Sequence, residues 1–282
     1  MIMLSTRYLF EDDPVQDLEN PPQEIEILLK GKRGTLLTML FTPKGAGPHP
    51  AVLLFHGFPG NEQMLDAGYA FRRIGFNVIT FHYSGCYGSE GKYSLLNDLD
   101  DARTLLEFVR DPENQETYGF EKDNVLLFGQ SLGGYVSLHT AADCEGIKGT
   151  VVASPFDFGR MYELSKTDER AHHIMYDIID SGIDWLNTTR EEFYGELDKN
   201  YVQLSAASKA DKLAGKTLSI ITSSYDTIAV PEENGKYIYD RVKEYGKGGL
   251  DYLSIPSTHN YSDKRCTLIK ESAERLCRIA NS

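Results

Sequence analysis

The pattern Gly-x-Ser-x-Gly at residues 129–133 constrains the fold of this chain more than any other feature of its sequence. It follows residues 125–128, Val-Leu-Leu-Phe, a short apolar run typical of a strand that is buried on both faces of a parallel sheet. Residues 135–142, with small side chains interleaved, predict a helix that packs closely on that sheet. In this context the motif predicts a sharp strand-to-helix turn that exposes the hydroxyl of Ser131.

Strand and helix patterns alternate along the chain from residue 51 onward. A second buried strand is predicted at the apolar run of residues 51–55, and further strands are predicted at residues 77–81, 149–153, 217–222 and 250–255. The clearest helical patterns cover residues 93–110 and 263–280, and a hairpin over residues 24–41 precedes the first buried strand. This alternation predicts an α/β fold with a doubly wound, mostly parallel sheet, whose reacting groups gather beyond the carboxyl ends of the strands.

Residues 156–215 interrupt the alternation. They are polar, charged and aromatic, they have a mostly helical pattern, and they are too long for an ordinary connection. We expect them to form a helical cap, or lid, over the carboxyl ends of the strands. Residues 1–155 and 216–282 would then form the core into which this cap is inserted.

Three residues near strand ends form a candidate catalytic set. A serine hydroxyl is a weak nucleophile, so Ser131 needs a general base and a group that orients that base. Of the seven histidines, only His259 lies downstream of both the serine and a strand-end carboxylate and also in a loop at the correct end of the predicted sheet. Asp226 is that carboxylate, and Asp157, which follows the preceding strand, is the alternative acid.

Two backbone amides are candidate donors to the negative charge that develops on oxygen when a serine attacks a carbonyl. One belongs to Leu132, the residue after the nucleophile. The other is expected in the turn that follows residues 51–55, where we choose the amide of Phe58. His56 begins this turn and is interpreted as a structural residue that holds it.

These motifs resemble the serine hydrolases of the α/β-hydrolase superfamily. The resemblance rests on His-Gly-Phe-Pro-Gly-Asn at residues 56–61, Gly-Gln-Ser-Leu-Gly-Gly at 129–134, Asp226 followed by Val-Pro at 230–231, and His259. Within the superfamily the chain is most similar to small bacterial esterases of the cinnamoyl and feruloyl type, and to the catalytic domain of acyl-aminoacyl and prolyl oligopeptidases. The resemblance implies an eight-stranded sheet, the chain order nucleophile, acid, base, and hydrolysis of esters or amides without a cofactor.

We therefore predict a serine carboxylic-ester hydrolase that acts through an acyl-enzyme on small-molecule esters with small or aromatic acyl groups, such as cinnamoyl or feruloyl. Trp185 of the expected cap and Tyr87 are candidate substrate contacts. An acyl-aminoacyl or dipeptidyl-type serine peptidase, a thioesterase and an acyltransferase would use the same three residues and stay open as alternatives. A non-catalytic binding protein on the same scaffold is a further alternative, although such proteins usually lose one of the three.

Composition and charge indicate which partners and which cellular compartment to expect. The net charge of −13 argues against a nucleic acid or an anionic membrane surface, because both would be repelled. No apolar run approaches the roughly 18 residues of a membrane span, and residues 1–13 lack the order of a secretory signal, so we expect a cytoplasmic protein. The four cysteines show no C-x-x-C spacing and are expected to be reduced, no metal site is predicted, and the oligomeric state stays open, a homodimer included.

Overall fold

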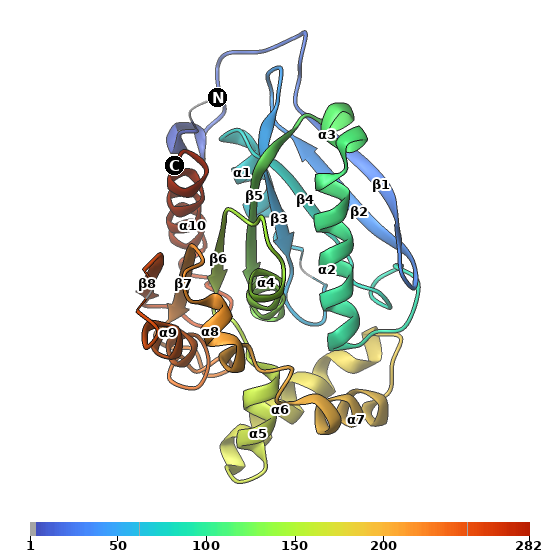
Figure 1. Cartoon of the computed structure of the whole chain (residues 1–282), viewed down its shortest axis with the longest axis vertical. Coiled ribbons are helices and arrows are strands. Elements are labelled where there is room, and N and C mark those ends of the chain that lie inside the picture. Colours follow the sequence, from blue (N-terminus) through green and yellow to red (C-terminus); the bar gives the residue numbers. More distant parts are fainter. Residues whose placement is uncertain (1–3, 62, 247) are drawn as a thin grey trace.

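The computed structural model describes residues 4–61, 63–246 and 248–282 and contains one eight-stranded sheet at its centre (Figure 1). The spatial order of the strands is β1-β2-β4-β3-β5-β6-β7-β8. The strands are β1 (Gln23–Gly31), β2 (Gly34–Thr42), β3 (His49–Phe55), β4 (Asn77–Phe81), β5 (Phe120–Gln130), β6 (Gly149–Ala153), β7 (Leu218–Ser223) and β8 (Leu250–Ile255). The pairs β1–β2 and β2–β4 are antiparallel and all other neighbours are parallel, so the predicted mostly parallel, doubly wound sheet is confirmed.

Helices cover both faces of this sheet. The helices of the described residues are α1 (Leu65–Arg73), α2 (Leu95–Arg110), α3 (Pro112–Tyr118), α4 (Leu132–Asp143), α5 (Phe158–Ser165), α6 (Glu169–Gly182), α7 (Arg190–Asn200), α8 (Ala210–Leu213), α9 (Gly235–Lys243) and α10 (Arg265–Ala280). The short 3₁₀ turns are η1 (Thr6–Tyr8), η2 (Ile183–Trp185) and η3 (Ala206–Lys209). The first three residues of the N-terminal segment, and Glu62 at the start of the first helical pattern, lie outside the described residues.

The buried side chains divide between the two faces of the sheet. Along β3, Val52 and Leu54 belong to the apolar cluster under α1 and α10, whereas Leu53 and Phe55 belong to the cluster under α2, α4 and α9. This division follows from the period of two residues in a strand, which turns successive side chains to opposite faces. Because both faces are covered, the central strands read as continuous apolar runs instead of alternating ones.

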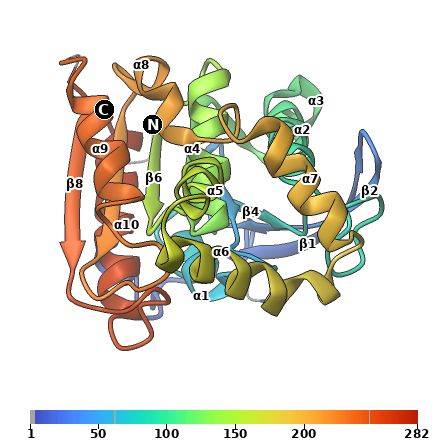
Figure 2. The ribbon, with the colours of Figure 1, turned by 90° about the horizontal axis from the view of Figure 1, so that it is seen from below.

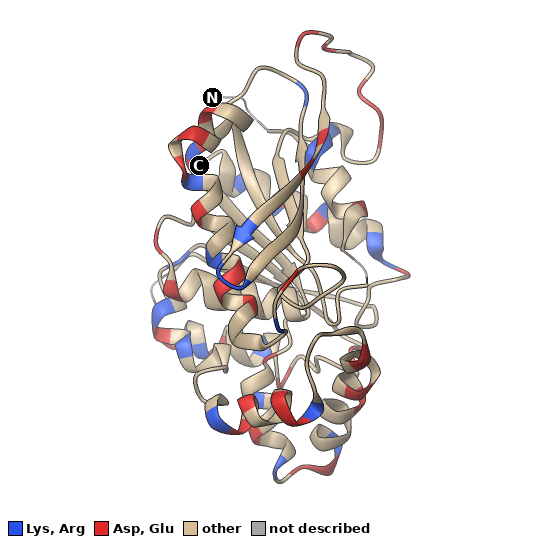
Figure 3. Cartoon of the chain, turned by 90° about the vertical axis from the view of Figure 1, so that its right-hand side faces the viewer, with Lys and Arg blue, Asp and Glu red and all other residues tan. Residues whose placement is uncertain are grey.

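Charged residues lie mainly on the helices and loops, and the centre of the sheet is almost free of them (Figure 3). Four strands of the sheet, β3, β4, β6 and β7, contain no Asp, Glu, Lys or Arg. An unpaired charge would have to lose its hydration in this interior, which explains why only uncharged side chains occupy it. Within the described residues, no helix combines the length and the apolarity that a bilayer span requires.

Of the helices in residues 156–215, α5, α6 and α7 lie beyond the carboxyl ends of the parallel strands (Figures 1 and 2), whereas α8 contacts α4 and α9. Several of their apolar side chains, among them Met175, Ile179 and Leu197, belong to the same buried cluster as Phe55 and Leu127 of the sheet. The apolar core on this face of the sheet therefore continues into the inserted helices. Their action as a movable lid stays a prediction.

One helix begins later than its sequence pattern suggests. Pro231 suits the first turn of a helix, and the pattern from there to residue 245 predicts one continuous helix. In the structure the chain first turns tightly, with Asn234 donating its amide N–H to the carbonyl of Val230, and α9 begins only at Gly235. The side chain of Asn234 accepts a hydrogen bond from the backbone of Asp157, so a tertiary contact fixes the turn in place of a regular helix.

Candidate active site

Ser131 stands between the end of β5 and the first residue of α4, at φ 55° and ψ −118°. L-residues rarely adopt a positive φ, so this backbone conformation is strained. Two backbone hydrogen bonds hold this conformation in place. The amide of Ser131 donates to the carbonyl of Ala153 at 3.0 Å, and the carbonyl of Ser131 accepts from the amide of Tyr135 at 3.0 Å. The predicted sharp strand-to-helix turn is therefore present.

The glycines of the motif allow two very close approaches of the backbone. A Cβ atom on Gly133 would lie 1.8 Å from the carbonyl oxygen of Phe55, at the end of β3. A Cβ atom on Gly129 would lie 2.1 Å from the carbonyl oxygen of Gly133 itself. No other residue type fits at these positions without movement of the backbone, so the two glycines seat the start of α4 directly on the strand ends.

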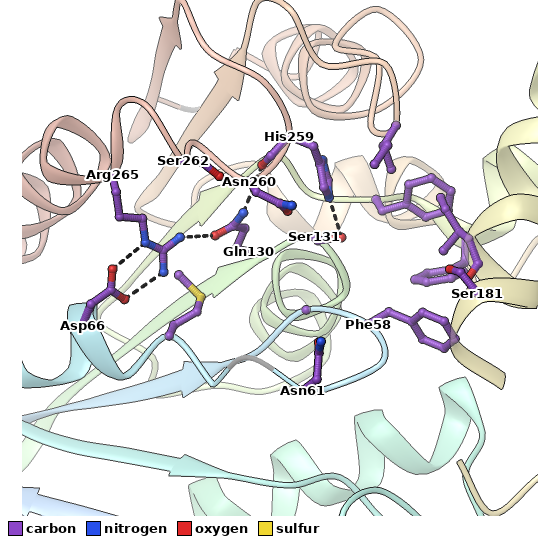
Figure 4. Close-up of a pocket in the computed structure, with 16 residues that line it drawn as sticks. Phe58, Asn61, Asp66, Gln130, Ser131, Ser181, His259, Asn260, Ser262 and Arg265 are labelled. Atoms are coloured by element: carbon purple, nitrogen blue, oxygen red, sulfur yellow. Dashed lines mark hydrogen bonds and ion pairs between the residues drawn. The ribbon is translucent and has the colours of Figure 1, made fainter. Parts of the chain in front are cut away.

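The structure brings Ser131, His259 and Asp226 together in one hydrogen-bonded row (Figure 4 shows the first two). His259 Nε2 lies 3.0 Å from Ser131 Oγ, and His259 Nδ1 lies 2.8 Å from Asp226 Oδ2. Both distances are within the range expected for a nucleophile, its base and the group that orients the base. The serine is partly exposed while the other two side chains are buried, so only the nucleophile end of the row is open.

Asp226 is held as a carboxylate. Its Oδ1 accepts hydrogen bonds from the amides of Ile228 at 2.9 Å and Ala229 at 2.8 Å, which leaves Oδ2 for the imidazole. Burial acts to raise the pKa of Asp226, but the hydrogen bonds from His259 and from the backbone outweigh it and hold this pKa below its usual value. A carboxylate in this position fixes the histidine tautomer with Nδ1 protonated and Nε2 free to accept a proton from the serine.

The alternative acid, Asp157, is engaged elsewhere. It caps the start of α5, where its carboxylate accepts hydrogen bonds from the amide of Arg160 at 3.1 Å, the hydroxyl of Ser205 at 3.0 Å and the amide of Ala207 at 3.0 Å. Its side chain is fully buried in these contacts and makes no hydrogen bond to His259 in the described structure. The geometry therefore favours Asp226 over Asp157 as the partner of the histidine.

The turn after β3 lies against the serine. A Cβ atom on Gly57 would lie 3.5 Å from Cβ of Ser131. Neither the amide of Phe58 nor that of Leu132 has a hydrogen-bond acceptor among the described residues, and Phe58 lines the same pocket as Ser131. Both amides are thus available as donors near the nucleophile, which is what the sequence predicts for them.

His56 stabilises this turn through a side-chain hydrogen bond to its backbone. Its ring is completely buried, and Nδ1 donates to the carbonyl of Gly57 at 2.8 Å. Burial lowers the pKa of His56 to about 4, so the ring is neutral at physiological pH. A Cβ atom on Gly60, at φ 109°, would lie 2.6 Å from this ring, so the glycine is needed for the turn to fold over the histidine.

A pocket of about 610 Å³ opens over Ser131 and His259, and its two walls differ in character (Figure 4). One wall is mainly apolar and includes Phe58, Phe156, Phe158, Ile178 of α6 and Ile228, with Ser181 on the same side. The other wall is mainly polar and includes Asp66, Gln130, Asn260, Ser262 and Arg265, and Asn61 and Met64 complete the lining. The candidate nucleophile therefore lies at the boundary between an apolar and a polar region.

Tyr87 and Trp185, the two candidate substrate contacts, do not line this pocket in the described structure. Their rings stack on each other with centroids 6.2 Å apart, and Tyr87 stacks on His82 at 5.3 Å on its other side. The Trp185 side chain is largely exposed, at 65% of its maximum. A role for these two residues in substrate binding stays a prediction.

Sequence reasoning missed a set of polar residues beside the candidate catalytic row. Gln130 occupies the variable position before the serine, and its side chain contacts both Arg265 and the backbone of His259. Arg265 also pairs with Asp66 of α1. Only the position of Gln130 next to the nucleophile could have drawn attention to it, because the other two residues belong to no motif.

Comparisons with known proteins identify the family and the fold of the chain. The model of the alpha/beta hydrolase family matches residues 52–246. An uncharacterized 31.7 kDa protein from the traX-finO intergenic region of Escherichia coli is 30% identical over 129 residues, which is 45% of this chain and 44% of that protein. The alignment thus spans less than half the length of that relative.

Two solved structures share the fold at low sequence identity. A bacterial brefeldin A esterase, a homologue of human hormone-sensitive lipase, superposes with a TM-score of 0.70 at 15% identity, over 97% of this chain and 82% of that one. The acylaminoacyl peptidase of Pyrococcus horikoshii superposes with a TM-score of 0.67 at 16% identity, over 92% of this chain and 41% of that one. The second superposition spans less than half of the peptidase.

Proposed function

Because the chain belongs to the alpha/beta hydrolase family, we propose that it is a serine carboxylic-ester hydrolase that forms an acyl-enzyme on Ser131. The observation that carries this proposal is the row of hydrogen bonds from Ser131 through His259 to Asp226, whose serine end opens into a pocket. This arrangement supplies a nucleophile, a base and an orienting carboxylate in one place.

The reaction follows from the atoms of this row. Ser131 Oγ attacks the ester carbonyl while His259 Nε2 takes its proton, and Asp226 stabilises the imidazolium that forms. The amides of Phe58 and Leu132 donate to the negatively charged oxygen of the tetrahedral intermediate. His259 then protonates the leaving alcohol as the ester C–O bond breaks. A water molecule then attacks the acyl carbon and gives a proton to His259. His259 returns this proton to Ser131 Oγ as the bond between Oγ and the acyl carbon breaks, which releases the acid.

The apolar wall of the pocket favours substrates whose acyl group is small or aromatic, cinnamoyl and feruloyl esters among them. The rings of Phe58 and Phe158 lie 6.5 Å apart at an interplanar angle of 62°, and both line the pocket. Such edge-to-face surfaces bind a flat aromatic group well. The similarity in fold to the brefeldin A esterase agrees with ester hydrolysis but does not define the acyl group.

A serine peptidase is the second candidate, since the acylaminoacyl peptidase of Pyrococcus horikoshii shares the fold. It would use the same three residues and the same acyl-enzyme, and it would differ in the leaving group, an amine in place of an alcohol. A thioesterase would release a thiol, and an acyltransferase would transfer the acyl group to an acceptor other than water. Rates on matched substrates therefore distinguish these activities.

The test is a panel of esters that share one alcohol and carry acetyl, butyryl, octanoyl and cinnamoyl groups, beside the matching thioesters and an N-acetylaminoacyl amide. Wild type is compared with Ser131→Ala and with Ser165→Ala, a serine at the end of α5 that does not line the pocket. We expect ester hydrolysis in wild type and in Ser165→Ala and its loss in Ser131→Ala. Substantial hydrolysis by Ser131→Ala would contradict the mechanism, and faster turnover of the amide than of the esters would favour the peptidase.

A further inference from the structure

A chain of polar contacts runs along the wall of the pocket toward the candidate base (Figure 4). It begins at Asp66 of α1, whose two carboxylate oxygens accept from Arg265 Nε at 2.6 Å and from Arg265 NH2 at 2.9 Å. Such a two-point contact fixes the plane of a guanidinium group. Arg265 NH1 then donates to the side-chain oxygen of Gln130 at 2.8 Å.

Gln130 connects Arg265 to the hydrogen-bonded row that contains His259 and Ser131. Its Nε2 donates to the backbone carbonyl of His259 at 3.0 Å, and its side chain is buried. It is the only described residue that donates to this carbonyl. Since Gln130 precedes Ser131 directly in the sequence, this hydrogen bond ties the turn that holds the nucleophile to the loop that holds the base.

The arginine determines which way the glutamine amide points. A carboxamide offers an acceptor on one side and donors on the other, whereas a guanidinium only donates. Arg265 can therefore bind only the oxygen of Gln130, and this leaves the NH2 group to face the carbonyl of His259. With the amide reversed, donor would face donor at Arg265 and oxygen would face oxygen at His259.

We propose that Arg265 is a positioning residue for the reaction: through the amide of Gln130 it fixes the backbone of His259, and so the distance from His259 Nε2 to Ser131 Oγ. Asp66 holds the guanidinium in the orientation that this requires. The inference rests on the proposed function, because it takes His259 as the base. Arg265 does not touch the reacting atoms, and its effect is carried by two hydrogen bonds.

Three variants isolate the contact. Arg265→Met removes the donors and keeps a long side chain, whereas Arg265→Lys keeps one donor for Gln130. Gln130→Glu keeps the size and the acceptor for Arg265 but has no donor for the carbonyl of His259. The control is Arg275→Met, also in α10, because Arg275 pairs with Asp251 at 2.7 Å and with Glu271 at 2.6 Å and does not line the pocket.

The first measurement is steady-state hydrolysis of an ester that wild type turns over. We expect Arg265→Met and Gln130→Glu to lower kcat by roughly fivefold to tenfold with little change in KM, which corresponds to the loss of one hydrogen bond. Arg265→Lys should recover most of the rate, and Arg275→Met should keep the rate of wild type. Wild-type kcat in Arg265→Met, whatever the rate of Gln130→Glu, or an equal loss in Arg275→Met, would overturn the proposal.

The second measurement does not depend on turnover. A proton on His259 Nδ1 that is shared with Asp226 gives a separate downfield proton NMR signal, and we expect this signal to broaden or shift in Arg265→Met and Gln130→Glu and to persist in Arg275→Met. An unchanged signal in Arg265→Met would refute the positioning role of Arg265. Wild type without serine-dependent turnover would contradict the proposed function instead, and the NMR signal would still decide whether Arg265 positions His259.

Discussion

Replacing Ser131 with glycine is expected to leave a more stable protein than replacing it with alanine. Ser131 adopts φ 55° and ψ −118°, a conformation that costs an L-residue about 1–3 kcal/mol. Glycine is free of this strain, but it gives up about 0.4–1 kcal/mol because its unfolded chain is more flexible. The difference leaves Ser131→Gly more stable than Ser131→Ala by about 1 kcal/mol, or roughly 2–4 °C in Tm for a chain of this size.

Urea unfolding of the two variants measures this difference directly. The matched control is Ser272, which is buried inside α10, where glycine should be less stable than alanine by about 1 kcal/mol. The sign of the alanine-to-glycine effect should therefore reverse between the two positions. Equal or greater stability of Ser131→Ala would refute the view that the turn stores backbone strain at the nucleophile.

Three further predictions test other parts of the structure. Burial, with the nearby carboxylates of Asp101 and Glu196, raises the pKa of Asp98 well above its usual value, so the folded protein keeps a proton that the unfolded chain loses above about pH 4. Stability is then lost as the pH rises toward the folded-state pKa, and urea unfolding should show Asp98→Asn more stable than wild type at pH 7, by a margin that shrinks toward pH 4; a margin independent of pH would contradict this. Asp226→Asn should lower kcat by about 10³-fold to 10⁴-fold in the ester assay through loss of the correct histidine tautomer, and near-normal turnover would move the orienting role to Asp157. Gly182→Ala would place a Cβ atom 2.3 Å from the ring of Phe58, so α6 or this ring must shift; thermal unfolding should show a loss of about 1–3 kcal/mol together with lower kcat/KM, and wild-type values would show that the contact relaxes freely.

Local sequence patterns were sufficient to predict the fold and to place the candidate site residues at strand ends. The apolar runs predict strands because a strand covered on both faces admits no polar alternation, and the order of these strands along the chain places Ser131, Asp226 and His259 at one edge of the sheet. The glycines of the motif predict the sharp turn because only glycine tolerates the contacts of Gly129 and Gly133 with the backbone.

Long-range contacts between side chains without a motif could not be predicted in this way. Asp66 and Arg265 are 199 positions apart, and nothing in the local pattern of either residue indicates the other. The pocket wall is a similar case, because Ile178 reaches it only through the packing of α6, and a sequence pattern does not define that packing. The aromatic character of Trp185 suggested a substrate contact, yet exposure and stacking on Tyr87 depend on the arrangement of the inserted helices.

The nucleophilic role of Ser131 is the central claim, and covalent labelling with a fluorophosphonate tests it most directly. The account predicts one adduct per chain in wild type by intact mass, located on the peptide that contains Ser131 after proteolysis, and no adduct in Ser131→Ala. An adduct on another residue, or a folded wild-type protein that stays unlabelled while ester hydrolysis proceeds, would contradict it.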